Sequence, residues 1–371
     1  MSFNTIFYYM IAVGALLGGL DYLLGNRFGL GARFKDGLNC IAPMAFNMAG
    51  ILILAPAIAR LLGPATARAC GMAGIDPAMF GALFAIDMGG YSVAAELAVN
   101  PQMGLFSGLI VSAMMGGVIT YIIPIGFGLI ADGDREFFIK GLMLGMIPIP
   151  VGSLAGGLLM GLPLGLLLRN LLPICAVAVL LIVGLLLCPN RVIRCFHAFN
   201  RFLSALTVCG LVAGALEYLT GWRLLAGAEP ILEALVIPGR ISVMLMGCLP
   251  LMSLVSRLLH GILEPLGRQL GVNAQTLEAL LLTTATAIPI FAMLRDMPPK
   301  GKTAAIAWMV GTMGILTAHL GFAMGVDPAV CQPQMVAKLV CGALSLTVAL
   351  CIPSRAAFYR PAAPSPPEKP S

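Results

Sequence analysis

The chain has 371 residues, of which 59% are hydrophobic and only 10% are charged, and its mean hydropathy is +0.97. Soluble domains carry roughly 25% charged residues, so this composition excludes an ordinary soluble protein and indicates a polytopic membrane protein. The net charge of +6 comes without a basic face interleaved with aromatic residues, so we expect no nucleic-acid partner.

Apolar stretches long enough to cross a bilayer recur along the chain. A transmembrane helix needs about 20 such residues, and the stretches that reach this length are 5–24, 39–62, 104–131, 137–161, 165–188, 199–220, 240–263, 303–326 and 334–353. Two further apolar stretches, 77–99 and 274–296, contain helix-breaking residues. We therefore expect an all-α polytopic membrane protein with about nine to eleven transmembrane segments.

The two interrupted stretches should break near their middles. In the first, Gly89 and Gly90 follow Asp87, and a glycine pair weakens a helix. In the second, the break is expected at Thr286-Ala287-Ile288-Pro289, because Pro289 lacks a backbone donor and clashes with the preceding turn. Broken backbone at membrane depth is tolerated only inside protein or beside a cavity. Both breaks are therefore expected to meet in the interior.

An internal repeat connects the same two stretches. Residues 74–128 align without gaps to 271–325. The identical pairs include Gly74 with Gly271, Pro101 with Pro298, Gly104 with Gly301, Gly117 with Gly314, and Thr120 with Thr317. Matched interruptions in corresponding parts of two repeats are typical of a transporter binding site.

The distribution of basic residues predicts the topology. Arg27, Arg33 and Lys35 follow the first span, Arg191, Arg194 and Arg201 lie at the start of the sixth, and Arg355 and Arg360 follow the last. Cytoplasmic loops are enriched in Lys and Arg, so all of these should face the cytoplasm, which requires 77–99 to re-enter instead of crossing. The halves are then inverted repeats, 1–162 and 191–354, joined by a linking transmembrane helix at 163–190 and followed by a disordered cytoplasmic tail at 355–371.

The sequence shows little sign of metal binding or catalysis. The ten cysteines form no Cys-x-x-Cys pair, and no spacing of histidines or acids suits a metal, so neither metal nor cofactor is expected. The sequence has no Gly-x-Ser-x-Gly, no His-Glu-x-x-His and no phosphate-binding loop, so an enzyme is not expected.

Several short motifs resemble one known family, in order and spacing, from about residue 38 to 353. They are Asp87-Met-Gly-Gly, Glu96-Leu-Ala, Ser107-Gly-Leu-Ile, Met114-Met115-Gly116, Ile147-Pro148-Ile149-Pro150, Ile288-Pro289-Ile290-Phe291, Lys300-Gly-Lys and His319-Leu-Gly-Phe322. The pattern is similar to that of the ethanolamine-utilisation membrane permease family, EutH. The resemblance implies a multi-pass protein of the bacterial inner membrane that transports ethanolamine. Thr286-Ala287 and Ala318 depart from the family pattern, which leaves a related small amino alcohol or amine open as the substrate.

A small ammonium alcohol needs a carboxylate or an aromatic face for its cationic end and polar partners for its hydroxyl. A charge at membrane depth costs at least about 2.5–3.5 kcal/mol and is seldom accidental, which makes Asp87 the leading candidate. The candidate substrate-binding residues are Asp87, Gly89, Gly90, Tyr91, Glu96, Asn47, Thr120, Thr283, Thr284, Thr286 and His319.

These residues also have structural explanations. Asp87 would equally cap a half-helix or pair with an arginine, and Glu96 would lie at the headgroup level. The threonine hydroxyls would bond to carbonyls of their own helices. His319 would be a neutral histidine bonded to a helix carbonyl.

The predicted function is import of ethanolamine, or a close relative, by facilitated diffusion of the cation, because the membrane potential alone supplies about 2.3 kcal/mol per 100 mV. A proton- or sodium-coupled carrier of another small amine is the alternative, and an intramembrane enzyme a more distant one. The expected partners are membrane lipid and, from the glycine-rich surfaces, a second copy of the chain in a homodimer.

Overall fold

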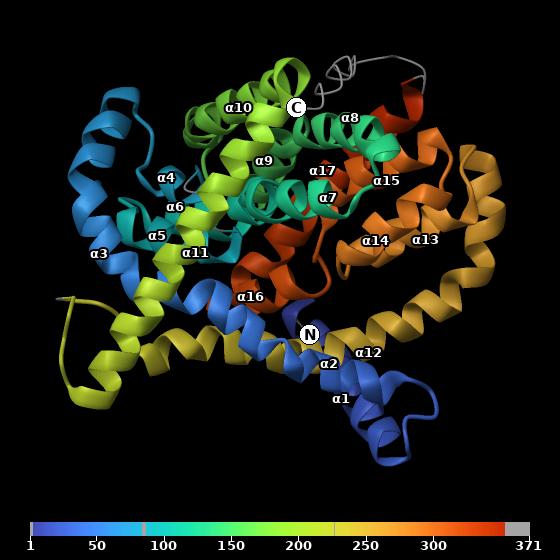
Figure 1. Ribbon diagram of the computed structural model, residues 1–371, viewed down its shortest axis with the longest axis horizontal. Helices are drawn as coiled ribbons and strands as arrows, with labels where there is room; N and C mark the ends of the chain where they lie inside the picture. The colour runs from blue at the N-terminus through green and yellow to red at the C-terminus, as the bar shows by residue number, and fades with distance from the viewer. Residues whose placement is uncertain (1–2, 84–86, 226, 353–371) are drawn as a thin grey trace, which may run out of the picture.

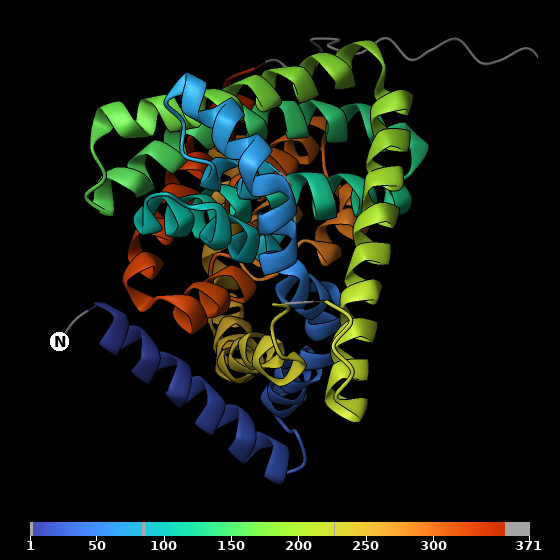
Figure 2. The ribbon, with the colours of Figure 1, turned by 90° about the vertical axis from the view of Figure 1, so that its left-hand side faces the viewer.

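The computed structural model describes residues 3–83, 87–225 and 227–352, and the described residues form helices without any strand. Among them, 8 helical stretches are long and apolar enough to cross a membrane: Thr5–Leu23, Leu30–Ala73, Pro101–Leu129, Asp132–Leu159, Leu164–Leu187, Pro189–Thr220, Ile231–Val255 and Pro328–Cys351. The expected class, an all-α polytopic membrane protein, is confirmed. Figures 1 and 2 show the helices from two directions.

An outer group of helices runs along the lower part of the molecule in Figure 1, with α3 at the left edge, the end of α12 at the right edge and α11 crossing in front. Its members are α1 (Phe3–Leu23), α2 (Leu30–Asn39), α3 (Ile41–Ala73), α11 (Pro189–Thr220) and α12 (Ile231–Leu270). Glycines allow these helices to touch backbone to backbone: a Cβ on Gly14 would lie 2.3 Å from the carbonyl oxygen of Gly247, and one on Gly50 would lie 1.8 Å from that of Thr207.

An inner group contains both interrupted stretches. From the first half it takes α4 (Ala78–Leu83), η1 (Asp87–Gly89), α5 (Gly90–Leu97), α6 (Pro101–Leu105), η2 (Phe106–Gly116), η3 (Val118–Ile122), α7 (Ile123–Leu129), η4 (Asp132–Asp134), α8 (Arg135–Met146) and α9 (Ile149–Leu159). From the second half it takes α13 (Ala274–Thr283), α14 (Ile288–Met293), η5 (Leu294–Asp296), α15 (Pro299–Thr312), α16 (Ala318–Val326), η6 (Pro328–Val330) and α17 (Cys331–Cys351). Helix α10 (Leu164–Leu187) connects the halves.

The first interrupted stretch turns back on itself. The Asp76 carboxylate accepts hydrogen bonds from the amide of Ala78, where the stretch begins, and from the amides of Val99 and Asn100, where it ends. Between these ends α4 and α5 lie in contact, since a Cβ on Gly81 would lie 2.5 Å from the Cα of Ala94. One carboxylate can join the two ends only if they lie at the same end of a hairpin.

The second interrupted stretch is closed in the same way. The side chain of Asn273 accepts from the amide of Thr276 and donates to the carbonyl oxygen of Asp296, at 3.1 and 3.0 Å. Asn273 is the residue that the repeat aligns with Asp76, and Asp296 aligns with Val99. In Figure 1 the first hairpin lies on the left, among α4, α5 and α6, and the second lies on the right, at α13 and α14. This arrangement agrees with the inverted repeat, which stays a prediction in its boundaries and its symmetry axis.

Two expectations about the second half are wrong in detail. Pro289 lies in the first turn of α14, where a proline is well tolerated because its missing N–H has no partner in the helix, so the break comes just before it. The span expected at 303–326 is not continuous: α15 ends at Thr312 and α16 begins at Ala318. Gly314 has φ +67 in this interruption, a conformation that glycine adopts without penalty.

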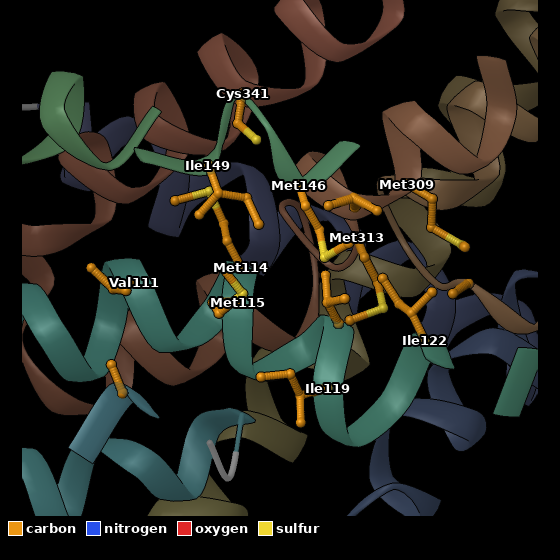
Figure 3. Packing of buried hydrophobic residues seen from close by; sticks show 14 of the residues in the cluster. Val111, Met114, Met115, Ile119, Ile122, Met146, Ile149, Met309, Met313 and Cys341 are labelled. Atoms are coloured by element: carbon orange, nitrogen blue, oxygen red, sulfur yellow. The ribbon is translucent and has the colours of Figure 1, made fainter. Parts of the chain in front are cut away.

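The two halves share a core rich in methionine. Figure 3 shows Met114 and Met115 of η2 facing Met309 of α15 and Met313, which follows α15, with Met146 between them. Methionine fills irregular gaps because its side chain is unbranched and flexible. The methionines are therefore core residues here, and they pack the two halves of the chain together.

Candidate functional site

Asp87 lies at the tip of the first hairpin in a strained conformation. Its φ of +32 is rare for a residue other than glycine, and strained backbone tends to gather at functional sites. Ser112 of η2 donates a hydrogen bond to its carbonyl oxygen at 2.5 Å, and a Cβ on Gly116 would lie 3.0 Å from its amide nitrogen. Gly90 has no room for a side chain either, because its Cβ would lie 2.4 Å from the Ser112 hydroxyl. The two glycines and Ser112 therefore hold the tip against η2.

The Asp87 carboxylate bonds to a histidine from the other half of the chain. Its Oδ1 lies 2.8 Å from Nε2 of His319, which is in the first turn of α16. The Asp87 side chain is 21% exposed, whereas that of His319 is 2% exposed. The other ring nitrogen, Nδ1, lies 2.8 Å from the carbonyl oxygen of Met313. From the sequence, His319 was interpreted either as part of the substrate site or as a histidine bonded to a helix carbonyl. The structure shows a bond to a carbonyl and also a bond to Asp87.

A lysine that sequence reasoning missed completes this cluster. Lys338 of α17 is fully buried, and its Nζ donates to the carbonyl oxygens of Ala113 and Met313 at 2.9 and 3.1 Å. Its charge also interacts with that of Asp87. The signal was present, since Lys338 is a lone charge inside the apolar span 334–353. Asp87 was selected because a charge inside the membrane is a functional candidate. The same rule applies to Lys338.

The break in the second hairpin packs against the interruption after α15. The amides of Gly314 and Leu316 donate to the carbonyls of Thr283 and Thr284, at 3.2 and 3.0 Å. The Thr317 hydroxyl donates to the carbonyl of Ala285 at 2.5 Å. These bonds satisfy backbone groups that no helix satisfies, which broken backbone within a membrane requires.

Tyr121 of η3 lies between the first and second breaks. Its hydroxyl lies beside the Thr286 side chain, and it interacts with the charge of Asp87. The first break is therefore connected to the second break through Tyr121, and to the interruption after α15 through His319. Direct contact of Gly89 and Gly90 with the second break stays a prediction.

The remaining candidates are dispersed. The hydroxyls of Thr120, Thr283 and Thr284 bond to Gly116, Ala279 and Leu281, carbonyls of their own helices, as the alternative interpretation held. The ring of Tyr91 packs edge-on against Phe322, with centroids 6.0 Å apart. Asn47 lies in α3, and its side chain is outside the described part of the structure.

Glu96 is exposed and belongs to a separate acidic group. Its charge acts on Glu229, which lies in the loop before α12 and neighbours Glu233. Partial burial, reinforced by both of these acids, raises the pKa of Glu229. The one interaction described for Glu96 is thus with a charge in the loop before α12, and not with Asp87.

Metal binding finds no support in the part of the chain that the structure describes, where no group of three or more His, Cys, Asp and Glu side chains is suitably placed. The Asp87 cluster instead offers one carboxylate, one imidazole and one amine, with the carbonyl oxygens of Ala113 and Met313 that accept from the amine. Such a set suits an organic cation with a hydroxyl group, which needs an anion and hydrogen-bonding partners.

Comparison with known proteins gives a consistent result. A family model described as "Ethanolamine utilisation protein, EutH" matches residues 3–352. A protein of Listeria monocytogenes named "Probable ethanolamine permease EutH" is 37% identical over 356 residues, covering 96% of this chain and 95% of that protein. A protein of Salmonella typhimurium with the same name is 34% identical over 389 residues, covering 94% and 95%.

A further relative, "Uncharacterized protein YxeR" of Bacillus subtilis, is 35% identical over 350 residues, covering 94% of this chain and 95% of that protein. No solved structure matches the chain. The names of the relatives support a transporter role, and the apolar helices make the chain a multi-pass membrane protein. The match of the family model over nearly the whole length, and the identity to two members, show that the chain belongs to the ethanolamine utilisation protein EutH family.

Proposed function

We propose that the protein carries ethanolamine, or a closely related small amino alcohol, across the bacterial inner membrane, with Asp87 as the counter-ion of the substrate ammonium group. The observation that carries this proposal is the position of Asp87. It is an acid at the tip of a hairpin, its side chain is 21% exposed, and it is bonded to a residue of the other half of the chain. The names of the relatives supply the substrate class.

The chemistry of the neighbouring groups fits both ends of such a substrate. An alkylammonium has a pKa near ~10.4, by analogy with lysine, so ethanolamine is a cation at neutral pH and needs an anion once its water is removed. The Tyr121 hydroxyl lies beside the Thr286 side chain and interacts with the charge of Asp87, and these two hydroxyl groups would bond to the substrate hydroxyl. Gly89, Gly90 and Tyr91 would shape the wall of the site.

The rest of the proposal follows the charges of the loops. The basic loops predict a cytoplasmic C-terminus, and a homodimer would bury the glycine-rich surfaces. The protein would act as a carrier and not as an enzyme. Two modes of transport are compatible with this function: facilitated diffusion of the cation, or exchange with another ion. The hydrogen bonds of His319 help to distinguish them.

The test is substrate binding by purified wild type and Asp87→Asn. The variant keeps the shape of the side chain and removes its charge, so affinity should fall more than a hundred-fold, because loss of a buried charge partner costs about 3–5 kcal/mol. The variant should still insert, since a neutral side chain is cheaper in a membrane than a charged one. Asp132→Asn is a matched control, because the Asp132 side chain is 87% exposed and lies outside the site. Near-normal binding by Asp87→Asn would remove Asp87 from the site.

A further inference from the structure

The hydrogen bonds of His319 determine how many protons the site holds. The carbonyl oxygen of Met313 can only accept, so Nδ1, at 2.8 Å, must carry a hydrogen. Nε2 lies 2.8 Å from Oδ1 of Asp87, and two acceptors at this distance would repel each other. One proton must therefore lie between Nε2 and Oδ1. The pair is either an imidazolium with a carboxylate or a neutral imidazole with a carboxylic acid, and its proton content is the same in both forms.

This proton occupies the place that a cationic substrate needs. In either form the Asp87–His319 pair has no net charge, so the carboxylate is not available as a free anion. An ammonium that replaces the proton leaves the net charge of the buried site unchanged. That equality matters because each uncompensated charge in a buried site is costly.

We propose that an ammonium substrate binds at Asp87 by displacing this one proton, so that each transport cycle exchanges one substrate cation for one proton. The proposal rests on the proposed function and names its coupling ion. The substrate N–H donates to the Asp87 carboxylate, while the bond of the displaced proton, to Nε2 or to Oδ1, breaks. The proton passes to water at the exposed side of Asp87. His319 keeps its Nδ1 hydrogen, and its Nε2 lone pair becomes an acceptor for the substrate.

The groups around the pair are consistent with release of the proton. The charged or titratable side chains that act on it from the packed elements are Tyr121 of η3 and Lys338 of α17, with Cys341 next to Lys338. Tyrosine and cysteine are mostly uncharged at pH 7. Lys338 shares the Met313 carbonyl with His319 and interacts with the Asp87 charge, so as an ammonium it stabilises the carboxylate when the proton leaves.

Exchange and facilitated diffusion differ in their driving force. A cation that crosses alone carries charge and responds to the membrane potential. A cation exchanged for a proton moves no net charge, so it should respond to a pH difference and not to the potential. No sodium ion is required.

The first experiment counts protons. Ethanolamine is titrated calorimetrically into the purified full-length protein at pH 7, in two buffers of different ionisation enthalpy. Wild type should release about one proton for each ethanolamine bound. His319→Gln can donate to Asp87 without holding an exchangeable proton, so it should release close to none. Binding by wild type without proton release would overturn the exchange, and so would undiminished release by His319→Gln.

The second experiment uses proteoliposomes that contain the wild-type protein. An acidic interior should raise accumulation of labelled ethanolamine, whereas an inside-negative potential at equal pH should leave its initial rate unchanged. Uptake that follows the potential and ignores the pH difference would overturn the exchange and leave the proposed function standing. Failure of the wild-type protein to bind or transport ethanolamine or related amino alcohols would instead refute the proposed function.

Discussion

Buried charged and polar side chains converge on a few carbonyl oxygens in this protein. Met313 lies just beyond the end of α15, so its carbonyl has no partner in a helix and accepts from both His319 and Lys338. Asp87 approaches the same point from the other half of the chain. An isolated charge in a membrane is expensive, whereas a cluster of donors and acceptors lowers that cost and keeps the groups in fixed positions.

Thr286 should influence which amino alcohol is preferred. Its side chain lies beside Tyr121 near Asp87, and it occupies one of the positions where the chain departs from the family pattern. Thr286→Asn should move the preference toward ethanolamine, measured by competition between labelled ethanolamine and related amino alcohols. Thr347→Asn is a suitable control, because Thr347 is exposed and bonds to its own helix. An unchanged order of preference would mean that this break does not line the site.

At the scale of elements, the interruption between α15 and α16 is what brings His319 to Asp87. Gly314 has φ +67, and a Cβ there would lie 3.0 Å from Nδ1 of His319. A continuous helix over 303–326 would leave the carbonyl of Met313 in an ordinary helical hydrogen bond, so it would be unavailable to Lys338 and His319. The interruption therefore frees the Met313 carbonyl as an acceptor and orients the imidazole of His319 toward Asp87.

Gly314→Ala tests this role directly. A side chain in the left-handed conformation costs about 1–2 kcal/mol, and here it also presses on the histidine ring. We expect a modest fall in thermal stability and a larger fall in ethanolamine affinity. Gly161→Ala is a matched control, since Gly161 has φ +78 and nothing within 4 Å of its absent Cβ. It should lose similar stability and keep its affinity. Equal losses of affinity in the two variants would show that the His319 ring does not depend on Gly314.

On the scale of the whole molecule, the hairpins and the loops predict the topology. The loop between α1 and α2 lies at the lower right in Figure 1, and the loop between α11 and α12 lies at the lower left. If both hairpins re-enter the membrane, the basic segments 27–35 and 191–201 should lie on the same side of it, and the loop at 221–230 on the other.

Single cysteines in a cysteine-free background can check this topology. Phe28 and Trp222 are 64% and 68% exposed, one in each loop. Trp222→Cys should react with an impermeant maleimide in intact cells, and Phe28→Cys only after the membrane is permeabilised. The reverse pattern would invert the orientation. Labelling of both from one side would mean that the number of crossings is wrong.

The sequence by itself determined the class of the protein and the two interrupted stretches, and it selected Asp87 as the leading candidate of a site that stays a prediction. Apolar length depends on the chemistry of each segment alone, so the all-α membrane fold could be predicted. The re-entrance of 77–99, which rests on the charges of the loops, stays a prediction. Asp87 could be predicted because a charge at membrane depth is costly wherever it points. The repeat also matched Asp76 with Asn273, although the function of these residues as hairpin ties was not apparent.

Only the tertiary structure decided which groups meet. His319 and Lys338 are 232 and 251 positions from Asp87, and no local pattern reports contacts over such separations. The interruption at Gly314 could not be read from an apolar stretch, because its broken backbone is satisfied by the carbonyls of Thr283 and Thr284 in another element. The proton on the Asp87–His319 pair follows from two distances to acceptors on different segments, and those distances exist only once the halves have packed together.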